Sequence, residues 1–220
     1  MKKENLLWIP EDELNVQEKK NIHWAKLRYY LDTQATTIWR YPIEELFSFL
    51  FAWVPTLIGV MLRLAAYKLL LQSSGTFFIE KNVSLKKIGN IRLGKSVFID
   101  ECCYIHACKN GVHIGDYSKI MRGAVLHVHN FRDEKQSGIW IGKNCYIADF
   151  ALIRGQGGTR IGDNVLISPY VSIFPSNHNY KDTSKPKNQQ GITSKGITIE
   201  DDVWIGANSV ITDGVTIHKG

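Results

Sequence analysis

The sequence predicts a mainly β protein: a parallel β-helix of hexapeptide repeats, preceded by a small α-helical N-terminal region. The first observation is a change of composition near residue 73, before which leucines, aromatic residues and charges are frequent and after which glycines recur. The second is a period of six, in which an Ile, Leu or Val returns at every sixth residue, as at Leu93, Ile99 and Ile105. We therefore divide the chain into residues 1–72 and residues 73–220.

A period of six fits neither an amphipathic helix nor a single half-buried strand. An amphipathic helix repeats about every 3.6 residues and a half-buried strand about every 2. Glycine or aspartate often follows the aliphatic residue, as at Gly94, Asp100, Gly115 and Gly162, which indicates a tight turn after each short strand. Three such units make one triangular coil of about 18 residues, in which the aliphatic side chain points inward and stacks on its equivalent one coil away.

The N-terminal region predicts helices. Residues 15–31 are charged with scattered apolar residues, which is typical of a solvated helix. The stretch 46–62 contains no charged residue and is interrupted by Pro55 and Gly59. As one helix it would be about 25 Å long, which is short for a hydrocarbon core of about 30 Å.

We expect residues 46–71 to form a kinked helix or a helical hairpin that lies shallowly in a membrane interface. Trp53, Arg63, Tyr67 and Lys68 would then lie near the lipid headgroups, where aromatic and cationic side chains gather. The alternative is a pair of helices that packs on the rest of the protein or on a neighbouring subunit.

The interruptions of the repeat all fall at one phase. They lie between residues 105 and 114, 126 and 141, 153 and 161, and 173 and 199, and each follows the third hexad of a coil. In a triangular prism the same phase is the same corner, so these insertions are predicted to stack along one edge. Loops inserted in a solenoid gather on its functional face, which places the expected site along this edge.

Histidines gather at the same edge. The residues that end the third hexads are His106, His127, Arg154 and Phe174. The two longest insertions carry His129 and His178. A single histidine is most often a surface or packing residue, but several along one edge beside exposed loops indicate a site. The glycine-rich run after Arg154 lacks the lysine and hydroxyl residue of a phosphate-binding P-loop, and we interpret it as a corner insertion.

The charge favours anionic partners. The 220 residues carry a formal net charge of +6, which suits phosphorylated cofactors or an anionic membrane surface. No motif of a nucleic-acid-binding fold accompanies the charge, so no nucleic-acid partner is expected. The sequence shows no signal peptide and no CxxC pair, which predicts reduced thiols in the cytosol. Three of the four cysteines are expected to be small apolar core residues; the four are Cys102, Cys103, Cys108 and Cys145.

The chain resembles the hexapeptide acyltransferases in two segments, IGDNVLISPYVSIFPSNHNYKD at 161–182 and ITIEDDVWIGANSVITDGVTI at 197–217. Within that family it is similar to galactoside, maltose and xenobiotic O-acetyltransferases and to polysaccharide O-acetyltransferases, over about residues 77–220. The resemblance implies a left-handed parallel β-helix and a homotrimer with active sites between adjacent subunits. It also implies acetyl-CoA as the acyl donor, a carbohydrate acceptor and no metal.

The resemblance also implies roles for single residues. His178 matches the family's catalytic histidine in the extended loop, and Trp204 matches the tryptophan near the acceptor and the cofactor. Gly206 and Ala207 match the small residues beside the pantetheine arm. The family's asparagine one coil before the loop is absent, so its role in acceptor binding is unfilled or passes to Asp149.

The remaining candidates follow from the chemistry. Transfer from a thioester needs a base for the acceptor proton, reactants held together, and donors for the oxyanion. Histidine suits the first task because it ordinarily titrates close to neutral pH. His127 and His129 are expected to contact the acceptor sugar, and Asn177 or Asp182 to orient the imidazole of His178; simple loop or turn roles are the alternative for each. Backbone amides of the facing coil would hold the oxyanion.

One departure concerns the end of the chain. Family members continue for two or three coils past the position of Gly220, and those coils contact the adenine and the phosphates of the cofactor. The resemblance therefore implies either a truncated sequence, with its C-terminal coils missing, or an incomplete cofactor site.

Three alternatives stay open. His106, His127 and His129 suggest a zinc site like that of γ-class carbonic anhydrases, although that family's His-x4-His pair is absent. A non-enzymatic trimeric scaffold at a membrane is the second, and an N-acetyltransferase of an amino sugar nucleotide is the third. The favoured prediction is O-acetylation of a sugar hydroxyl of a bacterial surface glycan or its lipid-linked precursor. The reaction would take place in the cytoplasm at the inner face of the cytoplasmic membrane.

Overall fold

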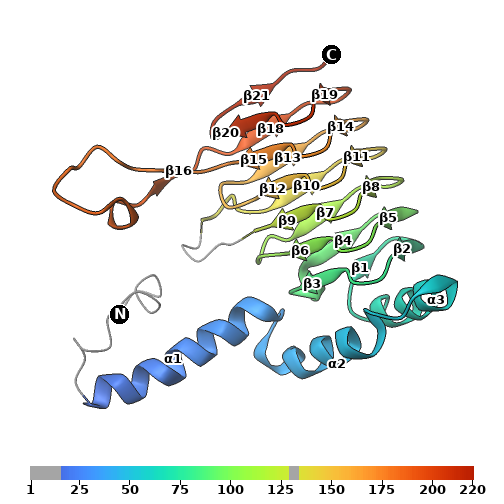
Figure 1. Ribbon diagram of the computed structural model, residues 1–220, viewed down its shortest axis with the longest axis horizontal. Coiled ribbons are helices and arrows are strands. Elements are labelled where there is room, and N and C mark those ends of the chain that lie inside the picture. Colours follow the sequence, from blue (N-terminus) through green and yellow to red (C-terminus); the bar gives the residue numbers. More distant parts are fainter. Residues whose placement is uncertain (1–15, 129–133) are drawn as a thin grey trace.

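The computed structural model describes residues 16–128 and 134–220, which form a group of helices and a long β-helix (Figure 1). The helices lie across the end of the β-helix where its first strands are (Figure 1). The helical elements are α1 (Val16–Gln34), η3 (Ile38–Arg40), α2 (Tyr41–Phe51), α3 (Thr56–Tyr67), η4 (Ile88–Asn90) and η5 (Lys187–Gln189).

The strands of the β-helix form three parallel sheets, one for each face of a triangular prism. Sheet A runs through β1 (Gln72–Ser73), β4 (Ile91–Leu93), β7 (Val112–Ile114), β10 (Ile139–Ile141), β13 (Thr159–Ile161), β18 (Ile197–Ile199) and β21 (Thr216–Ile217). Sheet B runs through β2 (Phe77–Ile79), β5 (Val97–Ile99), β8 (Lys119–Ile120), β11 (Tyr146–Ile147), β14 (Leu166–Ile167) and β19 (Trp204–Ile205). Sheet C runs through β3 (Ser84–Lys86), β6 (Tyr104–His106), β9 (Val125–His127), β12 (Leu152–Arg154), β15 (Ser172–Phe174) and β20 (Val210–Thr212). The predicted fold, a left-handed parallel β-helix, is confirmed.

The aliphatic residues of the repeat form the core. In sheet B the register places Ile99 opposite Ile120, Ile120 opposite Ile147, and Ile147 opposite Ile167, and all four side chains are buried. β-branched side chains suit such a pleated, packed surface. The prediction for the cysteines is confirmed, because three of them are buried in this core and only Cys102 is exposed.

Two of the three edges are tight turns that contain a residue with positive φ. Between sheets B and C these residues are Asn82, Cys102, Gly123, Phe150, Tyr170 and Asn208. Between sheets A and B they are Ser96, Tyr117, Asn144, Asn164 and Asp202. Asn and Asp tolerate this left-handed conformation better than bulky residues do. The third edge, between sheets C and A, carries the longer connections.

All four interruptions of the repeat lie at the C–A edge, as predicted. They connect β6 to β7, β9 to β10, β12 to β13, and β15 to β18. The last contains β16 (Asn177–His178) and β17 (Ile192–Thr193), which pair with each other in antiparallel fashion. This segment, here called the 175–196 arm, projects from the prism (Figure 1).

Buried polar contacts attach the helical region to the first coils. The Glu44 carboxylate in α2 accepts a hydrogen bond from the backbone N–H of Ile88 at 3.3 Å. The Thr36 hydroxyl accepts one from the backbone N–H of Gly89 at 2.9 Å. α3 packs against α2 and against β2. The helices therefore pack on the β-helix, as the alternative interpretation of residues 46–71 expects.

Arg63 and Tyr67 are buried, so the expectation that they lie near lipid headgroups is wrong. The Arg63 guanidinium donates from Nε to the carbonyl of Ile79 at 2.7 Å. From Nη1 it donates to the carbonyls of Phe51 and Val54, at 3.0 and 2.7 Å. The last carbonyls of a helix have no partner within it, and the chain reversal after α2 brings Arg63 back to them.

Trp53 and Lys68, by contrast, are exposed. In the part of the chain that the structure describes, no helix has the length and apolar character needed to cross a membrane.

Candidate functional site

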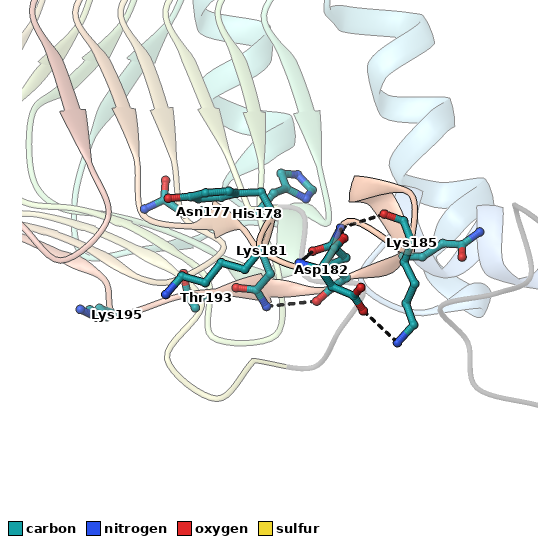
Figure 2. Close-up of a pocket in the computed structure, with 11 residues that line it drawn as sticks. Asn177, His178, Lys181, Asp182, Lys185, Thr193 and Lys195 are labelled. Carbon is teal, nitrogen blue, oxygen red and sulfur yellow. Dashed lines mark hydrogen bonds and ion pairs between the residues drawn. The ribbon is translucent and has the colours of Figure 1, made fainter.

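His178 lies on the 175–196 arm, within the short ladder that gives the arm its direction. It pairs with Ile192, while Asn177 pairs with Thr193. Both His178 and Asn177 are exposed. A pocket of about 1000 Å³ opens beside the ladder and is lined by residues of the arm itself (Figure 2). The backbone of His178 is therefore held in the ladder, and its imidazole is exposed on the arm.

Asp182 does not orient the imidazole of His178. Its Oδ1 accepts hydrogen bonds from the backbone N–H and the hydroxyl of Ser184, at 3.0 and 2.6 Å, and its Oδ2 lies 3.3 Å from Lys185 Nζ (Figure 2). These bonds, first of all the one from the hydroxyl of Ser184, lower the pKa of the Asp182 carboxyl. Asp182 is thus a turn former, which was its alternative role.

Gln190 braces the arm, a role that sequence reasoning missed. Its Nε2 donates to the carbonyls of Asp182 and Lys185 at 2.6 and 2.9 Å, and its Oε1 accepts from the backbone N–H of Asp182 at 3.1 Å. Its own carbonyl accepts from Asn179 Nδ2 at 3.1 Å. These bonds cross the loop, and no sequence spacing signals them.

Four polar side chains project from neighbouring strands of sheet C at the C–A edge. The register pairs Lys86 with His106, His106 with His127, and His127 with Arg154. We call these four residues the sheet C column. His106 is 7% exposed, and the other three are partly buried.

The imidazoles of the column stack, with ring centroids 4.9 Å apart and planes 13° from parallel. The Tyr104 hydroxyl lies 3.2 Å from Nδ1 of His106, and Arg154 Nη1 lies 2.8 Å from Nδ1 of His127. A guanidinium can only donate, so Nδ1 of His127 is the acceptor. His127 is therefore neutral in this arrangement, with its proton on Nε2.

The Arg154 guanidinium occupies the place that a metal would take at Nδ1 of His127, so in this arrangement a metal ion could reach that ring only at Nε2. Within residues 16–128 and 134–220, no group of three His, Cys, Asp or Glu side chains is arranged to hold a metal ion. His129, the third histidine of the zinc alternative and a candidate acceptor contact, lies outside the described residues.

Arg154, which the sequence analysis placed at this edge without a chemical role, contacts His127. The prediction that a corner insertion follows it is confirmed, with Gly158 at φ 89°. Burial lowers the pKa of the Arg154 guanidinium. Counting hexads places Arg154 one coil from His127, and that register is the signal by which the pair could have been found.

The expected cofactor residues lie on another side of the prism. Trp204 projects from sheet B with 75% of its surface exposed, and its Nε1 donates to the Ser168 hydroxyl at 2.9 Å. Gly206 and Ala207 follow at the edge between sheets B and C and are exposed. A β-carbon on Gly206 would meet no atom within 4 Å. The fold of a single chain therefore does not require glycine at this position.

Asp149 also lies at the edge between sheets B and C. It is partly buried, and its carbonyl accepts a hydrogen bond from the backbone N–H of Tyr170 at 3.1 Å. The rings of Phe150 and Tyr170 stack beside it with centroids 5.4 Å apart. One chain thus brings His178, Asn177 and His127 to the C–A edge, and separates them from Asp149 and Trp204.

Comparison with protein families agrees with this architecture. Residues 196–220 match a family model described as the hexapeptide repeat of succinyl-transferase. The chain carries hexapeptide repeats. It is 42% identical over 82 residues to a galactoside O-acetyltransferase from Escherichia coli strain K12, a match that covers 37% of this chain and 39% of that protein. It is 38% identical over 93 residues to an acyl-[acyl-carrier-protein]–UDP-N-acetylglucosamine O-acyltransferase from Campylobacter lari, covering 38% of this chain and 34% of that protein.

The hexapeptide-repeat chain therefore spans about two fifths or less of the length of these relatives. Among solved structures it is similar to AntD, an N-acyltransferase from Bacillus cereus in complex with dTDP-4-amino-4,6-dideoxyglucose and coenzyme A. That match has 21% identity, a TM-score of 0.42 and covers 70% of each chain. It is also similar to a hexapeptide-repeat acetyltransferase from Vibrio cholerae complexed with acetyl coenzyme A, at 19% identity and a TM-score of 0.32, covering 79% of this chain and 66% of that one.

Proposed function

We propose that this chain is an acetyl-CoA-dependent O-acetyltransferase that acts on a sugar hydroxyl of a bacterial surface glycan or its lipid-linked precursor. The observation that carries the proposal is the position of His178, an exposed imidazole on a braced arm at the edge where the insertions gather. The relatives support the reaction class, because both are named O-acyltransferases.

In the proposed reaction His178 is the general base. Its unprotonated ring nitrogen takes the proton of the acceptor hydroxyl as the hydroxyl oxygen bonds to the thioester carbonyl carbon. Collapse of the tetrahedral intermediate breaks the carbon–sulfur bond. The proton passes from the imidazolium to the leaving thiolate, which yields the acetyl ester and free CoA thiol. General-base catalysis of this kind is typically worth about 10²–10⁴ in rate.

A homotrimer would complete the site. A second subunit whose sheet B faces the arm would bring Trp204, Gly206, Ala207 and Asp149 to His178. Sheet B presents an exposed apolar ladder for such a contact, in which Tyr146 pairs with Leu166 and Leu166 with Trp204. Neighbouring exposed apolar and aromatic side chains of this kind suit a subunit contact.

The test of the reaction is acetyl-CoA turnover, followed by thiol release with a panel of glycan acceptors. We expect acceptor-dependent release in the wild type and a fall of about 10²–10⁴ in His178→Ala, with unchanged secondary structure. Release that His178→Ala leaves intact would reject His178 as the base. A higher rate with an amine acceptor than with a hydroxyl acceptor would replace O-acetylation by N-acetylation. A higher rate with an acyl-[acyl-carrier-protein] than with acetyl-CoA would replace the donor, and one relative is named for that donor.

The test of the shared site is complementation between inactive subunits. His178→Ala and Trp204→Ala chains are each expected to be inactive alone. Co-expressed in mixed trimers, they form some contacts that pair an intact His178 with an intact Trp204, and part of the activity returns. A mixture that stays inactive, although the mixed trimers form, would place the whole site within one chain.

We also propose that the helical region binds the surface of an anionic membrane, on its cytoplasmic face. Exposed apolar side chains recur at helical spacing on α2 and α3, and Phe49, Leu57 and Ile58 are 76, 72 and 70% exposed. The full set is Ile43, Leu46, Phe49, Leu50, Trp53, Leu57, Ile58, Met61 and Leu62. Because the helices lie at one end of the prism, parallel subunits would present these residues in one plane (Figure 1). The net charge of +6 favours anionic lipid.

Vesicle co-sedimentation tests this contact. The wild type is expected to sediment with vesicles that contain phosphatidylglycerol and less with phosphatidylcholine alone. The double variant Phe49→Ser, Leu57→Ser should stay in solution, whereas Val210→Ser, an exposed apolar residue of sheet C, should behave as the wild type. If the double variant binds vesicles as well as the wild type does, the apolar face does not bind the membrane. If the double variant instead changes its oligomeric state, the face is a subunit contact.

A further inference from the structure

We infer that Arg154 and His127 bind an anionic group, a phosphate or a carboxylate, on the acceptor. This inference rests on the proposed function, since it assigns a chemical class to the substrate of the same site. It begins from the sheet C column and uses four observations: an uncompensated charge, the donors around it, its place beside the arm, and the neutral state of His127.

Within residues 16–128 and 134–220, no carboxylate pairs with the charge of Arg154. The guanidinium is partly buried, and its one side-chain hydrogen bond is to the neutral Nδ1 of His127 at 2.8 Å. Among the ion pairs of the described residues, none involves Arg154. A charge withdrawn from water is costly unless it is paired. A guanidinium has five N–H donors, and the bond to His127 uses one of them.

Two neighbours of Arg154 in the described part of the chain can offer a hydrogen to an anion. The proton of His127 is on Nε2, and the Tyr104 hydroxyl lies within the same cluster, with its ring edge-on to His127 at 5.6 Å. Burial raises the pKa of the Tyr104 hydroxyl, so it stays protonated. Lys86, by contrast, is paired with Glu45 at 2.8 Å. Among the residues that the structure describes, Arg154 is therefore the cation of the column that has no counter-charge, beside groups that can donate to an anion.

The Arg154 end of the column lies one strand from β15, after which the arm that carries His178 begins. The corner after Arg154 contacts the start of the arm, because the carbonyl of Pro175 lies against Gly157. The return of the arm is tied to the same edge by a hydrogen bond from Gln136 Nε2 to the carbonyl of Ser194 at 2.8 Å. Adjacent strands of a sheet are about 4.8 Å apart, so an anion at Arg154 lies one coil from the arm's origin. A single acceptor molecule spans that distance.

The acceptor class that fits is a sugar bearing a phosphate, as in a glycosyl phosphate or a lipid-linked diphosphate, or an acidic sugar bearing a carboxylate. Both present oxygens that a guanidinium binds in bidentate fashion. Glucose 1-phosphate represents the first source, glucuronate the second, and methyl glucoside is the neutral control.

Titration calorimetry of the full chain with these three probes tests the inference without acyl transfer. We expect saturable binding of at least one anionic probe and none of methyl glucoside. Arg154→Gln should weaken that binding at least about tenfold, Arg154→Lys less, because a lysine keeps the charge but not the planar fork. The matched control is Arg160→Gln, which removes an arginine stacked over Trp140 at 4.2 Å on sheet A and should change nothing.

The outcomes separate this inference from the proposed function. The wild type could bind an anionic probe and show no acetyl-CoA turnover. If that binding is lost in Arg154→Gln and kept in His178→Ala, the anion site stands and the proposed reaction is rejected. Turnover with methyl glucoside, and no anionic probe bound, would overturn the anion site alone. Loss of the oligomer in Arg154→Gln with unchanged anion affinity would assign Arg154 to a subunit contact and overturn the inference. Arg154→Lys serves for the same comparison if the glutamine variant does not fold.

Discussion

The carbonyl oxygen of Pro175 lies against Gly157, at the place that a β-carbon on this glycine would occupy. Gly157 belongs to the corner after β12, and Pro175 begins the arm that carries His178. The arm therefore rests on the backbone of the coil beneath it, and the absence of a side chain at Gly157 sets how close the two can come.

Replacing Gly157 is expected to displace the arm. In Gly157→Ala the new methyl group overlaps the Pro175 carbonyl, and the backbone must shift at a cost of about 1–3 kcal/mol. We expect a Tm lowered by several degrees and a larger fall in kcat/KM, measured by calorimetry and thiol release. The matched control is Gly206→Ala, whose methyl group meets nothing in its own chain and should leave Tm unchanged. An unaltered Gly157→Ala enzyme would show that the arm does not depend on this contact.

Gln190 is expected to affect the arm and not the core. Gln190→Ala removes the three side-chain hydrogen bonds that hold Asp182 and Lys185. At about 0.5–1.5 kcal/mol each, their loss should free the arm while the β-helix keeps its Tm. Trypsin should then cut after Lys181 and Lys187 faster than in the wild type, and kcat should fall. Unchanged cleavage in the variant would mean that other contacts order the loop.

Arg63 is expected to be essential for the stability of the helical region. Arg63→Met leaves the carbonyls of Ile79, Phe51 and Val54 without their donor, which should cost about 2–4 kcal/mol in the free energy of unfolding. Urea denaturation followed by tryptophan fluorescence measures the change. Lys68→Met, at an exposed neighbouring position, should stay within about 0.5 kcal/mol of the wild type. Equal effects of the two substitutions would contradict the capping role.

The cysteines are expected to differ sharply in reactivity. Burial raises the pKa of Cys103 to about 12 and also raises the pKa of Cys108 and Cys145, while Cys102 is exposed. The thiolate is the reactive form, so at pH 8 a thiol reagent should titrate one thiol in the folded protein and four after denaturation. Cys102→Ser should abolish the titration of the folded protein. Two or more fast thiols would show that the core opens.

The same pKa shifts predict a loss of stability at high pH. Each buried thiol has a folded-state pKa above its unfolded value of 9.0, so folding favours the protonated form. Their contribution is complete below pH 9 and is lost as the pH rises toward 12, because the unfolded chain then releases protons that the folded chain retains. The Tm measured between pH 8 and pH 11 should fall, and replacing Cys103 with Ala should reduce the slope. A slope that the Cys103 variant leaves unchanged would point to other groups.

Much of the fold and one part of the site were predictable. The hexads that contain Ile99, Ile120 and Ile147 specify an inward ladder, because each repeat makes the same local turn and buries the same position. Counting hexads also placed every insertion, and with it His178, on one edge. The separation of Trp204 from that edge follows from the same count, and the proposed trimer would bring the two together.

The sequence by itself determined the prism, the edge at which its insertions gather and the loop that carries His178, because each hexad makes the same local turn and buries the same position. Tertiary structure alone decided where Arg63 points, because hydropathy records the composition of a segment and not the chain reversal that brings α3 back against α2. It also decided that Arg154 donates to His127 and that Gln190 braces the arm. Those contacts join residues far apart in the sequence through side-chain directions, which residue spacing does not encode.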